Sequence, residues 1–440
     1  MTRQPAIRLE GKPPAMTTAL GVSGFALEEA IAPCYQCGTC SATCPTAQAM
    51  DYSPRALWRL VELGMHDEVW KSNTFWMCTA CYSCTVRCPR EIPISESMRQ
   101  LRELYSQGEV GPLQDGLSAV LNAVEAQHNI ANEPNDTRLI WSENLPERPA
   151  QLDARQAEVL YFVGCVSALF PQTYGIPQSF VQILGQADVD YTVLGGEEWC
   201  CGYPVYGAGL QSRLGEIAEH NCARLAETGA RILVTTCPSC YYTWSHLYPE
   251  ILGRPMPVEI LHSTEFLAHL IDEKKLELGP VDDLVTYHDP CDLGRKSGIY
   301  DAPRQVLSSI PGLTFREMAQ HGADSLCCGG GGDIAMYSSD VAADVAQRRM
   351  RQAEAVGARS IVSACQQCKR TLADGGRKAR IRIRPIDITE LVWQSVQNAQ
   401  AGKEPAESAP APKPKAPKLY QWGTAPSSDL SGPPPKNESR

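Results

Sequence analysis

GARILVTTCPSC, residues 229–240, is a short apolar run that ends on two cysteines, and it returns as GARSIVSACQQC at residues 357–368. An apolar, β-branched run that follows a glycine predicts a buried strand. AEVLYFVGC (157–165) and DLVTYHDPC (283–291) form a second pair, and each of them ends on one cysteine. Both pieces recur after about 126 residues, which indicates an internal duplication of the second part of the chain.

Between these strands each copy carries two adjacent cysteines and a glycine, EWCCGYPVYGAG (198–209) in the first copy and SLCCGGGGDIAM (325–336) in the second. The intervals between cysteines are 34 and 35 residues in the first copy and 35 and 36 in the second. Agreement to within one residue supports the duplication. Each copy offers five thiols, one more than an ordinary four-cysteine cluster uses.

Helical patterns alternate with the predicted strands, for example at 212–229 and 340–357. Each copy is therefore expected to form a parallel sheet with crossover helices. Ligands of such folds gather outside the carboxyl ends of the strands, which is where these cysteines fall. We expect the five thiols of each copy to meet in one crevice.

The glycines beside the paired cysteines have a predicted role in binding. Without a Cβ, Gly202, Gly329 and Gly330 would let the backbone approach an inorganic cluster and donate N–H bonds to it. For Gly331 and Gly332 a flexible turn is an equally good explanation.

The N-terminal part contains two further cysteine runs, CYQCGTCSATCP (34–45) and CTACYSCTVRCP (78–89). Both have the spacing C-x₂-C-x₂-C-x₃-C-P of two-cluster ferredoxins, in which the fourth cysteine of each run completes the other cluster. Zinc is disfavoured, because tetrahedral zinc sites usually combine two C-x₂-C pairs. We therefore assign two cubane 4Fe–4S clusters, one to Cys34, Cys37, Cys40 and Cys88, the other to Cys78, Cys81, Cys84 and Cys44.

Composition narrows the class of protein. The chain has 440 residues, 19 cysteines and a net charge of −10, which argues against nucleic acid as a partner. It shows neither a signal peptide nor an apolar stretch long enough to cross a bilayer, so we expect a cytoplasmic protein with reduced thiols rather than a disulfide scaffold. No phosphate-binding glycine motif is present, so no flavin or nicotinamide site of its own is expected.

The predicted fold class is α+β and multidomain. Helical patterns at 53–70 and 95–109 flank the second cysteine run, so the ferredoxin-type domain should be mostly helical. The predicted boundaries are a flexible N-terminus (1–25), the two-cluster domain (26–106), a helical and polar connector (107–156), a first α/β domain (157–280), a second (281–398), and a disordered tail rich in Pro, Lys and Ala (399–440).

Taken together, these motifs identify a family. C-x₃₁₋₃₉-C-C-G-x₃₄₋₃₇-C-x-x-C, present twice, resembles the CCG domain of heterodisulfide reductases, and with the two ferredoxin runs the chain resembles their D-type catalytic subunits, or fused C-type and B-type subunits, over about residues 30–395. The resemblance implies two CCG domains related by a pseudo-twofold axis, each holding a noncubane 4Fe–4S cluster. Its implied ligands are Cys165, Cys200, Cys201, Cys237 and Cys240 in the first domain, and Cys291, Cys327, Cys328, Cys365 and Cys368 in the second.

The resemblance also implies a function. A disulfide would be reduced between the two noncubane clusters, or thiols oxidised in the reverse direction, and the cubane clusters would conduct the electrons. Partners would be a flavin-containing subunit or a membrane cytochrome b, in a multisubunit complex that could attach peripherally to the inner face of the membrane. The disulfide could be a small molecule or lie on a small sulfur-carrier protein.

Two other functions fit the same motifs. Iron–sulfur subunits of glycolate, lactate and glycerol-3-phosphate oxidoreductases share this layout and only relay electrons toward quinone. Complete five-cysteine sets in both copies favour the disulfide reaction, since a relay needs no such pair. A zinc-holding assembly scaffold is the third alternative, and it predicts zinc and a colourless protein.

Several other residues near the motifs have two possible roles. His288 and Asp289 either hydrogen-bond a cluster or substrate, or cap a loop. Arg295, Lys296, Lys369 and Arg370 follow ligand cysteines, where positive charge could attract an anionic thiol, but they are expected on the solvated surface. Cys222, the one cysteine outside the motifs, should be a small buried hydrophobe. In the tail, Tyr420 and Trp422 either anchor a partner subunit or pack locally.

Overall fold

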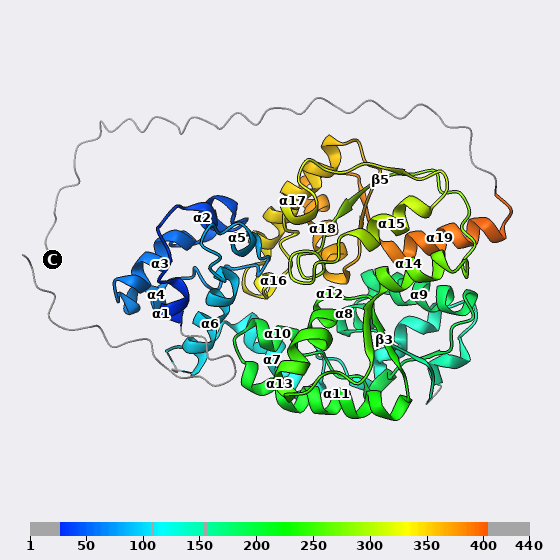
Figure 1. The fold of residues 1–440 in the computed structure, drawn as a ribbon, viewed down its shortest axis with the longest axis horizontal. Helices are drawn as coiled ribbons and strands as arrows, with labels where there is room; N and C mark the ends of the chain where they lie inside the picture. The colour runs from blue at the N-terminus through cyan, green and yellow to red at the C-terminus, as the bar shows by residue number, and fades with distance from the viewer. Residues whose placement is uncertain (1–26, 108–109, 154–155, 404–440) are drawn as a thin grey trace, which may run out of the picture.

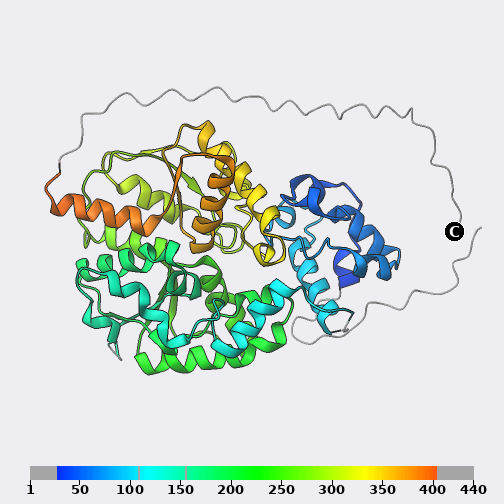
Figure 2. The same ribbon diagram turned by 180° about the vertical axis from the view of Figure 1, so that it is seen from behind.

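The computed structural model describes residues 27–107, 110–153 and 156–403. Three bodies are visible in Figure 1: a helical body at one end, in blue, and two α/β lobes beside it, in green and in yellow to orange. The same arrangement is seen from behind in Figure 2. The predicted N-terminal segment 1–25 and most of the predicted tail, from 404 onward, lie outside the described residues, as do Tyr420 and Trp422.

The N-terminal body is helical, as expected. Its helices, with those of the connector, are α1 (Leu27–Ile31), α2 (Thr39–Thr43), η1 (Ala47–Ala49), α3 (Pro54–Glu62), α4 (His66–Lys71), α5 (Ser83–Val86), α6 (Ile94–Gln107), α7 (Asp115–Gln127), η2 (Asn135–Asn144) and η3 (Ala150–Asp153). The single helix expected over 53–70 is wrong. Two helices form there instead, because Gly64 adopts a left-handed conformation (φ 69°) that ends α3.

The first α/β lobe follows. Its strands are β1 (Val159–Phe162), β2 (Tyr191–Thr192), β3 (Ile232–Thr235) and β4 (Glu259–His262). Its helices are α8 (Cys165–Leu169), η4 (Pro171–Thr173), α9 (Gly175–Gln186), η5 (Gly195–Glu197), α10 (Tyr203–Gly207), η6 (Gln211–Arg213), α11 (Leu214–Thr228), α12 (Pro238–Tyr242), the π-helix η7 (Thr243–Leu247), α13 (Tyr248–Leu252) and α14 (Ser263–Asp272).

The second lobe repeats this plan. Its strands are β5 (Leu284–His288), β6 (Thr314–Phe315), β7 (Ser360–Ser363) and β8 (Arg384–Asp387). Its helices are α15 (Asp301–Ser309), η8 (Gly322–Asp324), α16 (Ile334–Tyr337), α17 (Ser339–Ala355), α18 (Gln366–Ala379) and α19 (Ile388–Gln400).

The two sheets have the same parallel topology, which confirms the predicted duplicated α/β fold. Their strand orders are β2-β1-β3-β4 and β6-β5-β7-β8. The registers also correspond, because Phe162 lies opposite Thr235 in the first sheet and His288 lies opposite Ser363 in the second. Cα partners therefore define which residues of the two lobes are equivalent.

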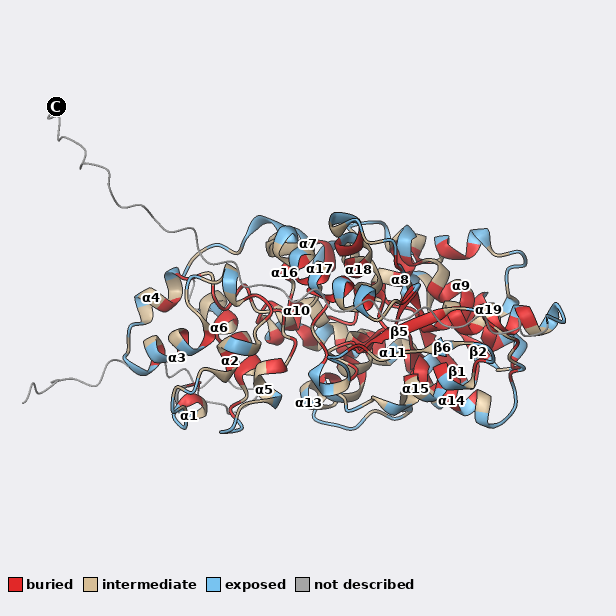
Figure 3. Cartoon of the chain, turned by 90° about the horizontal axis from the view of Figure 1, so that it is seen from above, coloured by how far each residue is buried: buried red, intermediate tan, exposed pale blue. Residues whose placement is uncertain are grey.

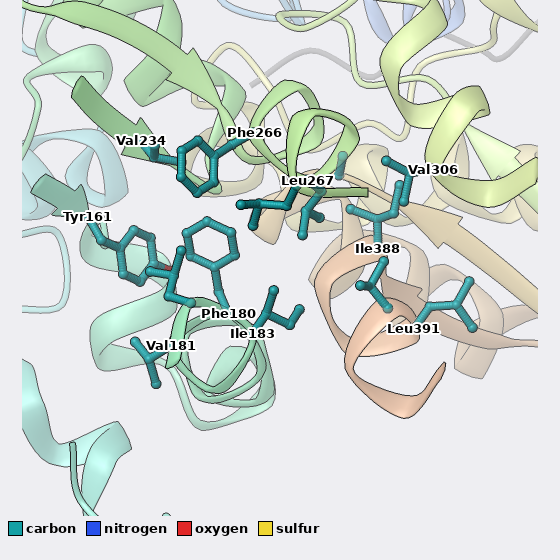
Figure 4. Packing of buried hydrophobic residues seen from close by; sticks show 14 of the residues in the cluster. Tyr161, Phe180, Val181, Ile183, Val234, Phe266, Leu267, Val306, Ile388 and Leu391 are labelled. Carbon is teal, nitrogen blue, oxygen red and sulfur yellow. The ribbon is translucent and has the colours of Figure 1, made fainter. Parts of the chain in front are cut away.

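Two reciprocal helix pairs join the lobes. Helix α9 of the first packs on α19 of the second, and α15 of the second packs on α14 of the first. The pairing exchanges equivalent helices, as a pseudo-twofold axis requires. One continuous core results, in which Leu267 and Ile183 lie between Phe180 and Phe266 of the first lobe and Val306 and Ile388 of the second (Figure 4). Burial of apolar surface thus holds the two lobes together.

The sheets are the buried centre of each lobe, and the outer faces of the helices are exposed (Figure 3). Strands that are covered on both faces read as continuous apolar runs, which is why the sequence pattern of the duplicated segments was so clear. Among the described residues, none of the helices combines the length and the apolar character that crossing a bilayer requires.

Candidate metal centres

The ten cysteines of the duplicated motifs line one cavity of about 350 Å³. Five come from each lobe, at the carboxyl ends of the strands and in the Cys-Cys-Gly corners, where the sequence placed them. They are Cys165, Cys200, Cys201, Cys237 and Cys240 from the first lobe and Cys291, Cys327, Cys328, Cys365 and Cys368 from the second. Two sets of soft sulfur donors thus face each other across a shared space.

The glycine of each Cys-Cys-Gly corner has the same local role. Gly202 (φ 87°) donates its N–H to the Cys200 sulfur over 3.4 Å, and Gly329 (φ 89°) donates to the Cys327 sulfur over 3.3 Å. A Cβ at Gly202 would lie 2.5 Å from Leu214 Cδ2, and one at Gly329 would lie 2.4 Å from the Ala342 carbonyl oxygen. Both corners therefore require glycine for conformation and for space.

Within each pair the second cysteine is the better thiolate. A hydrogen bond from Cys200 is the main cause that lowers the pKa of Cys201, to about 6. A hydrogen bond from Cys327 lowers the pKa of Cys328 in the same way. The Cys328 thiol also lies 3.3 Å from the Cys368 sulfur, and Gly330 donates its N–H to the Cys328 sulfur over 3.4 Å. Thiolates are the form that binds iron.

The ferredoxin-type cysteines group across the two runs. Cys34, Cys37, Cys40 and Cys88 line one small cavity of about 20 Å³. The charges of Cys78, Cys81 and Cys44 together act on Cys84, so these four thiols form the second group. Each group takes its fourth cysteine from the other run, which is the arrangement that the C-x₂-C-x₂-C-x₃-C spacing predicted. Four-sulfur donor sets of this kind suit 4Fe–4S clusters.

The second ferredoxin run lies against the second lobe. The Cys81 and Cys327 side chains lie in one small buried cluster, and interaction with Cys327 is the main cause that lowers the pKa of Cys81 to about 5. Arg295 connects the same two regions, because its Nε donates to the Cys81 carbonyl over 2.6 Å and its Nη2 donates to the Cys291 sulfur over 2.9 Å. Donors of the ferredoxin run thus touch donors of the second lobe directly.

Close backbone packing explains the remaining glycines of the four-glycine run. A Cβ at Gly331 would lie 2.7 Å from the Thr79 carbonyl oxygen, and one at Gly332 would lie 2.3 Å from the Cys78 carbonyl oxygen. The interpretation of Gly331 and Gly332 as a flexible turn is therefore wrong. Buried Arg102 fixes the junction, because it donates to the carbonyls of Gly332, Gly207 and Cys78 over 3.1, 2.8 and 2.8 Å.

The two alternatives given for His288 and Asp289 divide between them: His288 lies beside two ligand cysteines, and Asp289 supports a loop. The imidazole of His288 is fully buried, accepts a hydrogen bond from Arg349 Nε over 3.1 Å, and lies with the sulfurs of Cys328 and Cys368 within 4.8 Å of one another. Burial lowers the pKa of His288. Asp289 forms an ion pair with Arg304 at 2.8 Å.

The expectation that the basic residues after the ligand cysteines are solvated is wrong. Lys296 is 2% exposed and lies among four tyrosine rings, the nearest being Tyr242 at 4.0 Å. Lys369 pairs with Glu390 at 2.7 Å. The Arg370 guanidinium stacks on Phe170 at 3.9 Å, on the wall of the cavity. Cys222 packs among apolar residues of the first lobe, as expected, but it is half-buried rather than buried.

Three residues at the site were not predicted from the sequence. Arg138, in the connector, donates to the Cys165 sulfur over 3.5 Å and forms a buried ion pair with Glu198. Arg349, in α17, is buried behind His288. Glu198 precedes Cys200 by two residues, but a single acidic residue near a cysteine does not predict a buried ion pair. Arg349 sits in a helix with many polar residues, where an arginine normally faces solvent.

Comparisons with known proteins agree with this architecture. The family of cysteine-rich CCG domains matches residues 159–244 and 285–373, and the family of 4Fe-4S dicluster domains matches residues 30–92. A relative from Syntrophomonas wolfei, EtfAB:quinone oxidoreductase, is 28% identical over 74% of this chain and 47% of its own length. A solved structure of a hypothetical protein from Helicobacter pylori has a TM-score of 0.56 at 10% identity, covering 84% of this chain and 71% of that one, which shows a shared fold.

A more similar relative is the D-type subunit of the dihydromethanophenazine:CoB–CoM heterodisulfide reductase of Methanosarcina barkeri. It is 33% identical over 323 residues, which are 72% of this chain and 77% of that protein. Together with its dicluster domain and two CCG domains, this similarity shows that the chain belongs to the family of D-type heterodisulfide reductase subunits, iron–sulfur oxidoreductases with CCG domains.

Proposed function

We propose that this protein is the iron–sulfur catalytic subunit of a heterodisulfide reductase-like complex, which reduces a disulfide to two thiols or runs in reverse. The reaction is R–S–S–R′ + 2e⁻ + 2H⁺ → R–SH + R′–SH. The observation that carries this proposal is the single cavity of about 350 Å³ between two complete five-cysteine sets. Because the two sets face each other across this cavity, a disulfide that bound between clusters held by them would have its S–S bond between the two donor sets.

The cysteine sets fit two noncubane 4Fe–4S clusters, and the ferredoxin runs fit two cubane clusters. When bound, such clusters supply single electrons and soft metal centres with affinity for sulfur. The contact between Cys81 and Cys327 supports entry of electrons through the second lobe. The external electron donor, a flavin-containing subunit or a cytochrome b, would dock to the N-terminal body, where Cys37 and Tyr35 are exposed.

The remaining cavity wall suits a substrate with an apolar arm and an anionic group. Val120, Ile130, Phe170 and Met336 provide the apolar surface, and Arg370 adds a positive charge. A small disulfide with a carboxylate, sulfonate or phosphate matches these walls. A disulfide on the flexible arm of a small carrier protein is the second substrate class that fits.

A hydrogen-bonded chain on the same wall is positioned to hold the protons that two thiolate products need. The Tyr203 hydroxyl donates to Asp292 Oδ1 over 2.7 Å, and the Ser239 hydroxyl donates to Asp292 Oδ2 over 2.7 Å. Lys296 Nζ donates to the Tyr203 hydroxyl over 2.8 Å. Tyr203, Ser239 and Asp292 all line the cavity, so the chain connects the cavity with a buried ammonium group.

Substitution of one thiol tests the proposal. In the anaerobically purified protein with its clusters, Cys328→Ser should abolish disulfide-dependent oxidation of a reduced dye such as methyl viologen, while the cubane signals in electron paramagnetic resonance (EPR) persist. Cys222→Ser, outside both donor sets, should keep wild-type turnover and iron content. Full turnover of Cys328→Ser with an unchanged iron content would contradict the proposal.

The alternative function is an electron relay without substrate chemistry. It is favoured by the similarity to the EtfAB:quinone oxidoreductase of Syntrophomonas wolfei. Incubation with a thiol separates the two functions. Catalysis predicts a cluster EPR signal that changes when thiol is added, because the cavity admits sulfur ligands, whereas a relay predicts unchanged signals.

A further inference from the structure

We propose that the two noncubane sites are electrostatically unequal, and that Arg295 gives the second-lobe cluster the higher reduction potential, so that it is reduced first. This inference rests on the proposed function only in requiring a cluster in each lobe. The electron passes in one step from the cluster of Cys78, Cys81, Cys84 and Cys44 to that of the second lobe, and no bond forms or breaks.

Each lobe places one arginine on the same cysteine of its set. Arg138 Nη1 donates to the Cys165 sulfur over 3.5 Å, and Arg295 Nη2 donates to the Cys291 sulfur over 2.9 Å. Cys165 and Cys291 are equivalent, since both directly follow the first strand of their lobes. The arginines themselves are not equivalent, because Arg138 comes from η2 of the connector and Arg295 from the loop after Cys291 itself.

The charge of Arg138 is cancelled by a carboxylate. Arg138 and Glu198 form an ion pair in which both side chains are 1% exposed. Glu198 is held in place by the backbone N–H groups of Val163 and Gly164, each at 2.9 Å. A cluster in the first lobe therefore faces a nearly neutral pair.

The charge of Arg295 is not cancelled in this way. Its guanidinium donates to the backbone carbonyls of Cys81, Ala323 and Ser325 over 2.6, 3.1 and 2.7 Å. Carbonyl dipoles satisfy the N–H donors but leave the net charge. Within the part of the chain that the structure describes, no carboxylate forms an ion pair with Arg295.

At three further equivalent positions, the residue in the second lobe is less negative, more positive or a better hydrogen-bond donor than its counterpart in the first lobe. Ser325, two residues before Cys327, replaces the acidic Glu198, which stands two residues before Cys200. His288 replaces Phe162 at the end of the first strand, as the sheet registers show. A third position, in helices α11 and α17, changes from Asn221 to the buried Arg349, which donates to Ser325 Oγ over 3.0 Å.

Asp289 and Asp292 of the second lobe stand where the first lobe has Val163 and Val166, but their charges are paired with Arg304 at 2.8 Å and Lys296 at 3.6 Å. The remaining differences act on the reduction potential in one direction. A positive charge and a hydrogen bond to a ligand sulfur both stabilise the reduced cluster, and the effect is strong where water is excluded. The second-lobe site also touches the ferredoxin run, because Cys81 and Cys327 lie in one buried cluster and Arg295 donates to the Cys81 carbonyl. The first electron is therefore retained beside its point of entry, and the second must reach the first lobe before a disulfide can be cleaved.

A potentiometric titration followed by EPR, on anaerobically purified protein with its clusters, tests this. Signals lost in Cys201→Ser and in Cys328→Ser identify the two lobes. Wild type should show two separate midpoint potentials, the higher in the second lobe. Arg295→Gln should shift that potential to a more negative value and leave the other unchanged, and Arg295→Lys, which keeps the charge, should restore most of it.

The reverse change is predicted in the first lobe. Glu198→Gln leaves the charge of Arg138 uncancelled and should raise the lower potential toward the higher one. Arg359→Gln, a charge change at an exposed position before β7, should move neither. Equal potentials in wild type, or a shift of the wrong signal in Arg295→Gln, would overturn the inference. If Arg295→Gln loses iron, the Glu198→Gln titration decides. A protein without noncubane signals in either lobe would instead contradict the proposed function.

Discussion

The two lobes share topology, register and a complete set of five cysteines, yet they differ in the residues directly behind those cysteines. The first lobe has Phe162, Glu198 and Asn221 where the second has His288, Ser325 and Arg349. The donors at the cavity were kept in both copies, whereas the charges and hydrogen bonds behind them diverged. This difference shows that the same five donors can stand in two different electrostatic environments within one duplicated fold.

The largest effect on stability is expected from removal of the buried carboxylate of the first lobe. Glu198→Ala leaves Arg138 as an uncompensated buried charge, which should reduce the free energy of unfolding by about 3–5 kcal/mol. Ser325→Ala at the equivalent position of the second lobe removes one hydrogen bond to Arg349 and should cost about 1 kcal/mol. Denaturant unfolding of the two variants measures this difference in unfolding free energy. Equal losses of stability in both would contradict the predicted difference between the lobes.

A smaller loss is expected where the second lobe receives the ferredoxin run. Gly332→Ala places a Cβ 2.3 Å from the Cys78 carbonyl oxygen at a residue with φ 60°, and should cost about 2–3 kcal/mol. It should also slow reduction of the second-lobe cluster in stopped-flow experiments, because Cys81 moves away from Cys327.

Gly253→Ala is the matched control for this change. Gly253 has φ 63° but open space around its Cα, so only backbone strain of about 1 kcal/mol is expected there. If both variants lose the same stability and keep the wild-type rate of reduction, Gly332 has no special contact with the ferredoxin run.

Conversion of the second lobe toward the first should have a moderate effect. His288→Phe removes the acceptor of the Arg349 Nε hydrogen bond and should cost about 1–2 kcal/mol. Iron content per chain should stay at the wild-type value, because the five thiols remain. A loss of iron in this variant alone, with Phe162→His unchanged, would identify His288 as a metal ligand.

The smallest effect is expected at Cys222. Its equivalent in the second lobe is the buried Met350, so this position serves packing in both lobes. Cys222→Ala should cost no more than about 1 kcal/mol and leave iron content and turnover unchanged. Loss of a cluster signal in this variant would show that a nineteenth ligand had been missed.

The elements that could be predicted from the sequence are those with a regular spacing of residues. Cysteine spacing and buried parallel strands have strict periods, so the duplicated sheets and the cavity with Cys200–Cys201 and Cys327–Cys328 were predictable. Residues whose role depends on a single tertiary contact could not be predicted. Arg138 and Lys296 look like solvated residues in the sequence, because burial of a charge depends on partners that are distant along the chain. The break at Gly64 was missed since one glycine inside a helical pattern is often tolerated.

The proposed chemistry requires two facing cysteine sets that each hold a noncubane cluster. Anomalous diffraction at the iron edge, from crystals grown without oxygen, tests this most directly. We predict iron at four places, two in the N-terminal body and two on opposite walls of the cavity, each of the latter bordered by all five sulfurs of its lobe. Absence of iron at the cavity, or ordinary four-cysteine cubes in both lobes, would contradict the account.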